Sequence, residues 1–238
     1  MMRDLQNNGI TKKPMKVLGY GNVRGVDMEY YSKREDVIRR MEDLKLRDET
    51  KFTFIFVGRV VRDKGIDELI EAFKKLYFDF PNSRLYLVGP TEDNLDPIDD
   101  KTRNAIEAYD DIIEVGPKMG EDLLPYYAAS DCFVLPSYRE GFPNTVLEAG
   151  AMGLPSIVTN INGSREIIQD GINGMIVPPH DANALYKAMT KMIKDVELRN
   201  QMAGNARGMI ASRFEQGFVR KCLYDFYDEI LVDGSHTF

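Results

Sequence analysis

The sequence predicts an α/β fold in which helices cover both faces of a parallel sheet and several further helices follow at the C-terminal end. From residue 51 onward, short β-prone apolar runs alternate with segments whose apolar residues recur at helical spacing. The runs are apolar at nearly every position, as is typical of strands buried on both faces of a parallel sheet. After Asp181 only the helical spacing continues. This order of patterns favours an α/β protein that ends in helices.

Each expected strand ends where a glycine, a proline or a polar loop interrupts the apolar run. The first strand, Phe-Thr-Phe-Ile-Phe-Val at 52–57, is closed by Gly58. The other strands are expected at 85–88, 112–115, 131–136, 155–159 and 175–177. Helices are expected at 37–46, 66–76, 101–109, 123–129 and 145–152, and then at 184–193, 197–210 and 214–231.

These patterns divide the chain into three segments. Residues 1–50 combine a Gly-rich stretch at 16–27 with a charged helix, and we interpret them as a linker that arrives from a domain upstream. Residues 51–213 form the predicted Rossmann-like domain, which is long enough to bury a substantial core. Residues 214–238 are expected to form the last helix and a tail.

The composition excludes several kinds of partner. A formal net charge of −7 disfavours nucleic acid, whose phosphate backbone requires a basic surface. Two scattered cysteines, Cys132 and Cys222, are too few for a metal cage, and we expect no metal or other cofactor. No apolar run approaches the roughly 20 residues that span a bilayer, and the N-terminus lacks the apolar core of a signal peptide. We therefore expect a cytoplasmic protein without a transmembrane segment, peripheral to a membrane at most.

The stretch 137–148, Ser-Tyr-Arg-Glu-Gly-Phe-Pro-Asn-Thr-Val-Leu-Glu, is the most informative part of the chain. It places Glu140 in a Gly/Pro turn and Glu148 inside the helix that the turn opens, directly after an expected strand. Ligands of open α/β sheets bind outside the carboxyl ends of the strands, and a helix N-terminus there attracts anions. Two carboxylates beside such an anion could hold hydroxyl groups, and this combination suits a sugar nucleotide.

Two cations are expected at the same edge of the sheet. Gly58 and Arg59 close the first strand, and Lys64 precedes the next helix. A diphosphate carries about two negative charges, which two fixed cations and helix-end amides would neutralise without a metal. On their own, such loop cations are more often simply solvated. Their pairing with Glu140 and Glu148 favours the phosphate site.

The turn itself offers backbone donors to a phosphate or a sugar. Phe142, Asn144 and Thr145 could present their N–H groups, whereas Pro143 has none. Asn144 could equally be the N-cap of the helix, a role that needs no ligand. The loop 162–166, Asn-Gly-Ser-Arg-Glu, follows the next strand, either as a plain turn in which Ser164 caps a helix at Glu166 or as a further lining of the site.

These motifs together resemble glycosyltransferase family 4. The segment 56–65 resembles that family's strand followed by Gly-Arg and Lys-Gly, and residues 140–149 match its pattern of two glutamates with seven residues between them. Residues 153–159 and 170–179 look like its later signatures, and Gly-Val-Asp at 25–27 looks like the linker to its C-terminal domain. The resemblance implies the GT-B fold, retention of anomeric configuration, and that this chain is the donor-binding C-terminal half.

The resemblance also implies roles for individual residues. Arg59 and Lys64 would hold the departing diphosphate, Glu140 the hydroxyls of the donor sugar, and Glu148 those of the ribose. Gly58 and Gly141 would complete the donor site, together with the N–H groups of Phe142, Asn144 and Thr145. The base would lie at the end of the third strand, near Val115 and Lys118.

The expected activity is transfer of a hexose or N-acetylhexosamine from a nucleotide diphosphate sugar to a glycan or lipid-linked acceptor. Bacterial surface-polysaccharide synthesis is the pathway we expect, although the resemblance itself does not imply it. UDP is the commonest donor nucleotide in the family, but no residue decides between UDP, GDP and ADP. The acceptor domain has no counterpart here, so we expect the chain to be inactive without an N-terminal domain, in cis or in trans.

Alternatives remain open from the sequence. The chain could be a non-catalytic module that binds nucleotide sugars, or a related sugar-nucleotide epimerase, which would release nucleotide diphosphate without an acceptor. The last helix is expected to leave five apolar residues partly exposed, which favours a partner or a dimer. These residues are Phe218, Leu223, Phe226, Tyr227 and Ile230.

Overall fold

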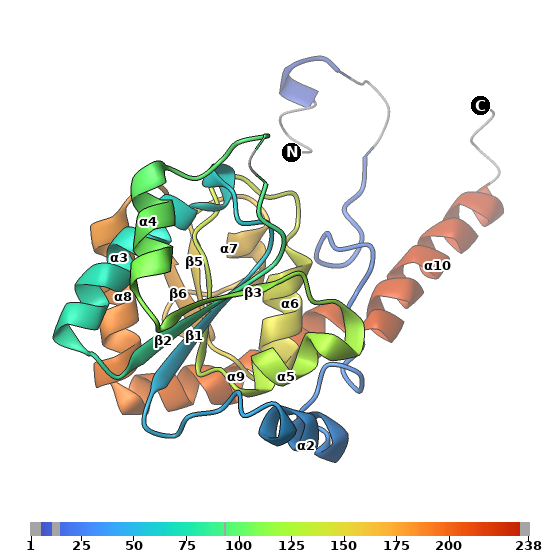
Figure 1. The fold of residues 1–238 in the computed structure, drawn as a ribbon. Coiled ribbons are helices and arrows are strands. Elements are labelled where there is room, and N and C mark those ends of the chain that lie inside the picture. Colours follow the sequence, from blue (N-terminus) through green and yellow to red (C-terminus); the bar gives the residue numbers. More distant parts are fainter. Residues whose placement is uncertain (1–5, 11–14, 93, 234–238) are drawn as a thin grey trace.

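The computed structural model describes residues 6–10, 15–92 and 94–233, in which a six-stranded parallel sheet forms the centre of the molecule (Figure 1). The strand order is β3-β2-β1-β4-β5-β6. The strands are β1 Phe52–Val57, β2 Ser83–Val88, β3 Ile112–Gly116, β4 Cys132–Leu135, β5 Ser156–Thr159 and β6 Gly174–Val177. The parts of the predicted linker and tail at 1–5, 11–14 and 234–238 lie outside the described residues.

Helices cover both faces of this sheet. Helices α3, α4 and α8 lie on one side and α5 and α6 on the other, while α9 packs against both α6 and α8 (Figure 1). The helices are α2 Glu35–Asp43, α3 Ile66–Asp79, α4 Asp100–Ala108, α5 Leu124–Ala128, α6 Asn144–Ala151, α7 Ser164–Ile167, α8 Ala182–Lys194, α9 Val196–Phe214 and α10 Gln216–Asp233. The predicted fold class is confirmed.

All the predicted strands and longer helices are present, and their bounds shift by a few residues. The helix predicted at 37–46 ends earlier, because the chain turns at Lys45, which has a positive φ of 51°. Short helix α7 appears in the loop that follows β5, where the Glu166 carboxylate accepts a hydrogen bond from the backbone N–H of Gly163.

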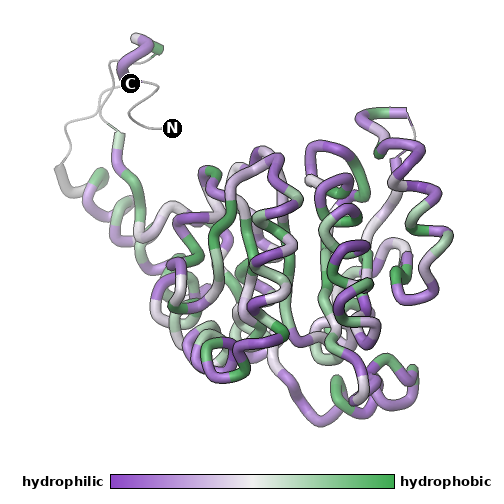
Figure 2. Tube along the Cα trace, turned by 90° about the vertical axis from the view of Figure 1, so that its left-hand side faces the viewer, coloured by the Kyte–Doolittle hydropathy of each residue, from purple (hydrophilic) through white to green (hydrophobic). Residues whose placement is uncertain are grey.

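The core is built from the apolar runs that predicted the strands. Phe54, Ile55 and Phe56 of β1 are fully buried, with Phe133 of the adjacent β4 beside them. Figure 2 shows the apolar residues gathered along the strands and the inner faces of the helices. Burial on both faces explains why the strands are continuously apolar.

The order of the strands reverses between β1 and β4, and this point positions the site. The 3-10 turn Arg62–Lys64 (η1) and the start of α3 follow β1, and they press against the end of β4. Gly65 makes this approach feasible, since it has a φ of +70° and a side chain there would overlap the carbonyl group of Pro136. The loops after β1 and β4 therefore meet at the carboxyl edge of the sheet, where α/β proteins bind their ligands.

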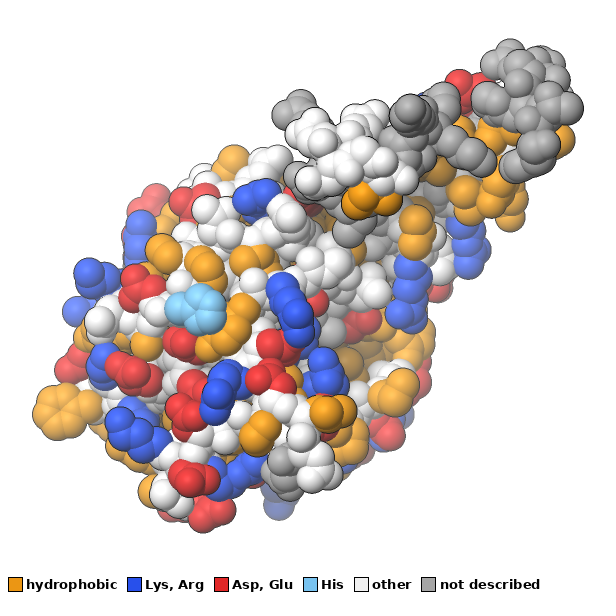
Figure 3. Space-filling view, turned by 90° about the horizontal axis from the view of Figure 1, so that it is seen from above, with side chains coloured by type: hydrophobic (Ala, Val, Ile, Leu, Met, Phe, Trp, Pro, Cys, Tyr) orange, Lys and Arg blue, Asp and Glu red, His pale blue; other side chains and the backbone are white. Residues whose placement is uncertain are grey.

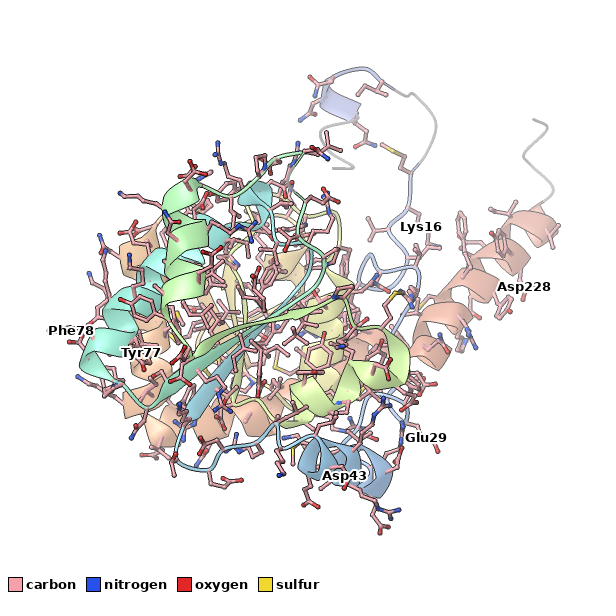
Figure 4. The ribbon with its side chains drawn as sticks, in the orientation of Figure 1. Lys16, Glu29, Asp43, Tyr77, Phe78 and Asp228 are labelled. Atoms are coloured by element: carbon pink, nitrogen blue, oxygen red, sulfur yellow. The ribbon has the colours of Figure 1, made fainter. Side chains whose placement is uncertain are left out.

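The segment before β1 lies along the body and along α10. Val26 pairs with Glu215, and Val37 and Met41 of α2 belong to the core. Lys16 lies beside α10, where its ammonium group pairs with Glu229 and faces the ring of Phe226 (Figure 4). Helix α10 projects from the body (Figure 1), and the five apolar residues predicted to be partly exposed are so.

Candidate functional site

The first predicted carboxylate, Glu140, is held by two donors at the carboxyl edge of the sheet. The Lys64 ammonium group lies 2.7 Å from its Oε1 atom, and the Ser137 hydroxyl donates to the same oxygen at 2.8 Å. The side chains of Lys64 and Glu140 are only 17% and 15% exposed. Two of the three predicted catalytic residues are therefore in direct contact.

The third, Arg59, pairs with Glu92, which follows the end of β2. Its guanidinium group pairs with Glu92 at 2.9 Å, and this pair is more exposed, at 49% and 32%. Figure 3 shows basic and acidic side chains intermingled across this face of the molecule. Both predicted phosphate ligands are thus paired with a carboxylate in the structure.

The N-terminus of α6 lies between the two predicted carboxylates, as the strand-turn-helix order requires. The helix begins at Asn144, so the residue before it is Pro143 and no side chain caps this end. Asn144 is thus the first helical residue rather than the N-cap. Gly141 has open space where a side chain would stand, and it lines a cavity of about 810 Å³. Uncapped amides beside an open glycine leave room for an anion.

Glu140 and Glu148 face two different cavities, one on each side of this helix start. Glu148 and Asn144 line a cavity of about 280 Å³, and Glu140, Gly141 and Phe142 line one of about 810 Å³. The larger volume falls in the range of roughly 300–1,000 Å³ that is usual for small-molecule sites. The two glutamates, eight positions apart, thus lie at two separate cavities.

Tyrosines surround Glu148, and sequence reasoning missed them. The Tyr127 hydroxyl donates to its Oε2 atom at 3.1 Å, and Tyr31 lines the same cavity as Glu148 and influences its carboxyl group. Burial raises the pKa of Glu148, although both tyrosines oppose that shift. The pKa values of both tyrosines are also raised, mainly by their own burial.

Residues of the segment before β1 complete the smaller cavity. Arg24, Tyr30 and Tyr31 line it together with Glu148, and Asn22 donates through its amide to Asn144 at 3.4 Å. Only the Gly-Val-Asp signal at 25–27 marks this segment in the sequence. The other cavity-lining residues of this segment reach the cavity only because the folded chain passes close to the start of α6.

The loop 162–166 is both a turn and a lining of the larger cavity. Asn162, Gly163 and Glu166 line that cavity together with Glu140. The cap of α7 comes from Glu166, not from Ser164, whose buried hydroxyl has no partner among the described residues. The loop therefore lines the cavity, as one alternative predicted, and also forms a turn that leads into a short helix, but Ser164 is not its cap.

Arg59 and Lys64, the two predicted phosphate ligands, line neither cavity, and the same holds for four predicted donor-site residues. Gly58 lies at the end of β1, Thr145 is the second residue of α6, and Val115 and Lys118 lie at the end of β3, the edge strand. Gly120, two residues beyond Lys118, does line the smaller cavity. The residues of the predicted base site therefore precede a cavity-lining residue in the chain but do not line the cavity themselves.

A metal site requires clustered ligands and a membrane-spanning helix must be long and apolar, and the described part of the chain has neither. Among those residues, no group of three or more His, Cys, Asp and Glu side chains could hold a metal ion. Within the same residues, no helix is long and apolar enough to cross a membrane.

The fold is that of an α/β domain of the GT-B type. Residues 38–209 match the family model described as glycosyl transferases group 1. The chain belongs to this family, glycosyltransferase family 4, and corresponds to its C-terminal donor-binding domain.

Curated relatives agree with this assignment. The chain is 29% identical to the Staphylococcus aureus capsular polysaccharide biosynthesis glycosyltransferase CapM, over 97% of this chain and 60% of that protein. It is 30% identical to the Escherichia coli UDP-Gal:alpha-D-GlcNAc-diphosphoundecaprenol alpha-1,3-galactosyltransferase, over 92% of this chain and 56% of the relative. The chain therefore spans little more than half the length of these two relatives.

Solved structures support the fold. Anabaena HepE, in complex with UDP and glucose, superimposes with a TM-score of 0.75 at 20% identity, covering 86% of this chain and 55% of HepE. The C-terminal domain of LpcC from Francisella tularensis superimposes with a TM-score of 0.69 at 24% identity, covering 80% of this chain and 99% of that domain.

Proposed function

We propose that this chain is the donor-binding half of a retaining glycosyltransferase that uses a UDP-sugar. The transferred group is a hexose or an N-acetylhexosamine, and the acceptor is a glycan or a lipid-linked sugar of a surface polysaccharide. The observation that carries the proposal is the separation of Glu140 and Glu148 into two cavities on either side of the uncapped start of α6.

This arrangement matches the three parts of a nucleotide diphosphate sugar. The ribose binds in the smaller cavity, where Glu148 accepts its hydroxyl hydrogens. The diphosphate crosses the start of α6 and meets the backbone N–H groups of Asn144 and Thr145. The sugar lies in the larger cavity against Glu140, near the N–H group of Phe142.

The reaction rests on stabilising the departing diphosphate. Arg59 and Lys64 supply positive charge where negative charge develops as the bond between sugar and phosphate breaks, and no metal is needed for this. Lys64 bridges the diphosphate and Glu140, whereas Arg59 leaves Glu92 to reach the phosphate. The base lies near Val115 and Lys118, and Gly58 and Gly141 let the backbone approach the donor closely.

Transfer to an acceptor requires a second domain that faces this edge of the sheet. The relatives' names support surface polysaccharide synthesis as the pathway, because CapM is named for capsular polysaccharide and the Escherichia coli relative for a UDP-galactose donor. On this proposal the chain alone binds the donor and does not transfer the sugar.

Calorimetric titration with UDP and with UMP tests the diphosphate site. We expect UDP to bind more tightly than UMP, and Arg59→Ala or Lys64→Ala to reduce this difference roughly tenfold, the usual effect of losing one charge-assisted hydrogen bond. Lys75→Ala, which removes an exposed cation from α3, serves as the control. Unchanged UDP and UMP affinities in both site variants would contradict the proposed roles.

A further inference from the structure

Ser137 is a buried polar residue that the family resemblance gives no role. Its side chain is fully buried at the end of β4, and its hydroxyl donates to Glu140 Oε1 at 2.8 Å. Its backbone carbonyl accepts a hydrogen bond from the hydroxyl of Thr159, which is also buried and ends the neighbouring strand β5. Two adjacent strands thus fix this serine in place.

The contacts divide the two oxygens of Glu140 between the protein and the cavity. Oε1 accepts from both Ser137 and Lys64, so buried donors fill its lone pairs. Within the described residues, Oε2 has no partner, and Glu140 is one of the residues that line the cavity of about 810 Å³. A carboxylate oxygen only accepts hydrogen bonds, so a ligand group beside Oε2 must donate one.

We propose that Ser137 is a positioning residue that fixes Glu140 so that Oε2 selects the hydroxyl pattern of the donor sugar. This inference rests on the proposed function of the site. A carboxylate held at one oxygen by two donors has one allowed orientation, and its free oxygen then meets a sugar hydroxyl at a defined place. The sugar it selects is neutral at this contact, because a uronate carboxylate would face Oε2 with like charge.

Lys64 alone would not give this selectivity. An ammonium group is a point charge on a flexible stem, and it turns towards the diphosphate when the donor binds. The Ser137 hydroxyl has no such second demand, since the serine is fully buried and its hydroxyl donates to Glu140. The serine therefore keeps the orientation of Glu140 while Lys64 bridges both groups.

The test is calorimetric titration of the full chain with UDP, UDP-glucose, UDP-galactose and UDP-N-acetylglucosamine. The affinity of each UDP-sugar is expressed relative to that of UDP, which isolates the contribution of the sugar. We expect the wild-type affinities for the three UDP-sugars, each relative to UDP, to differ by roughly tenfold or more, the usual effect of one hydrogen bond to a charged group. We call this range of relative affinities the spread. Ser137→Ala should make the three relative affinities nearly equal and leave the UDP affinity within about twofold of the wild type.

Three further variants separate positioning from a merely structural role. Ser137→Thr keeps the hydroxyl and should restore the spread. Thr159→Val removes the hydrogen bond to the Ser137 carbonyl and should partly reduce the differences among the relative UDP-sugar affinities. Ser156→Ala removes a buried serine hydroxyl that has no partner in the described structure, and it should leave both the spread and the UDP affinity unchanged.

Each remaining outcome has one meaning. A Ser137→Ala protein that keeps the wild-type spread overturns the inference, and so does a wild type that binds UDP without distinguishing the sugars. Loss of UDP binding together with the spread in Ser137→Ala, but not in Ser156→Ala, also overturns it, since the serine would then support the whole site. A folded wild type that does not bind UDP overturns the proposed function itself.

Discussion

At the scale of single residues, the two cations of the site differ in how strongly their carboxylate partners hold them. The Arg59–Glu92 pair is largely exposed, and such pairs contribute about 0–1 kcal/mol. Arg59 can therefore leave Glu92 at little cost, but Glu92 still competes with an incoming phosphate. The Lys64–Glu140 pair is less exposed, at 17% and 15%, and on the proposed function Lys64 keeps Glu140 while it also reaches the diphosphate.

This competition predicts that Glu92→Gln binds UDP more tightly than the wild type, by roughly twofold to fivefold, because Arg59 loses its competing partner. The gain should be larger at low ionic strength, where charge interactions are less screened. Calorimetry at two salt concentrations measures it, with Glu71→Gln on the exposed face of α3 as the control for net charge. Equal or weaker binding would show that Glu92 does not compete for Arg59.

Glu148 predicts an opposition between stability and binding. Because burial raises the pKa of Glu148 in the folded state, folding favours the protonated acid, and stability falls as the pH rises through that raised pKa. Glu148→Gln should thus be more stable than the wild type at neutral pH, with the difference shrinking towards pH 4, near the unfolded pKa of about 4.3. The same variant should bind UDP more weakly.

Urea unfolding between pH 4 and pH 8 measures this difference, with Glu71→Gln as the matched control. A stability difference between Glu148→Gln and the wild type that does not change with pH would show that Glu148 does not titrate with a raised pKa.

At the scale of elements, the contact between the start of α3 and the end of β4 holds the two halves of the site together. Gly65→Ala should lower the free energy of unfolding by about 2 kcal/mol or more, because its φ is positive and the new methyl group would overlap Pro136. Gly208→Ala in α9 is the control, since nothing lies within 4 Å of its added carbon and alanine favours a helix. Gly208→Ala should raise stability by roughly 0.5–1 kcal/mol.

An equal effect of the two substitutions in chemical denaturation would contradict this account of the junction between β1 and β4.

The same elements show what the sequence can predict. The strands were predictable because their apolar runs are buried on both faces, and Glu140, Lys64 and Glu148 because they follow strand ends in a recognisable order. The four-residue helix α7 was only an alternative, because it is too short for a helical pattern and depends on the Glu166 cap.

Partners across the fold could not be predicted. Tyr127 and Tyr31 reach Glu148 from distant parts of the chain, and Ser137 acts through a hydrogen bond that only its buried geometry reveals. Nothing in the sequence indicates that Arg59 pairs with Glu92. Tertiary contacts of this kind leave no periodic pattern in the chain.

At the scale of the whole molecule, helix α10 exposes large apolar side chains away from the body. Tyr224, Tyr227 and Leu231 are all more than half exposed, and clustered apolar surface favours association. We expect the chain to self-associate with increasing concentration, and Tyr227→Lys with Leu231→Lys to shift it towards monomer. Sedimentation velocity over a concentration series measures this, and a wild type that stays monomeric throughout would contradict it.

The central claim is that this domain by itself binds the donor nucleotide, and metal-free calorimetric titration with UDP, GDP and ADP tests it most directly. We predict saturable binding of UDP in preference to the other two nucleotides, and weaker binding by Glu148→Ala, which removes the carboxylate facing the smaller cavity. The absence of binding for all three nucleotides, in a chain shown by its thermal unfolding to be folded, would contradict the claim.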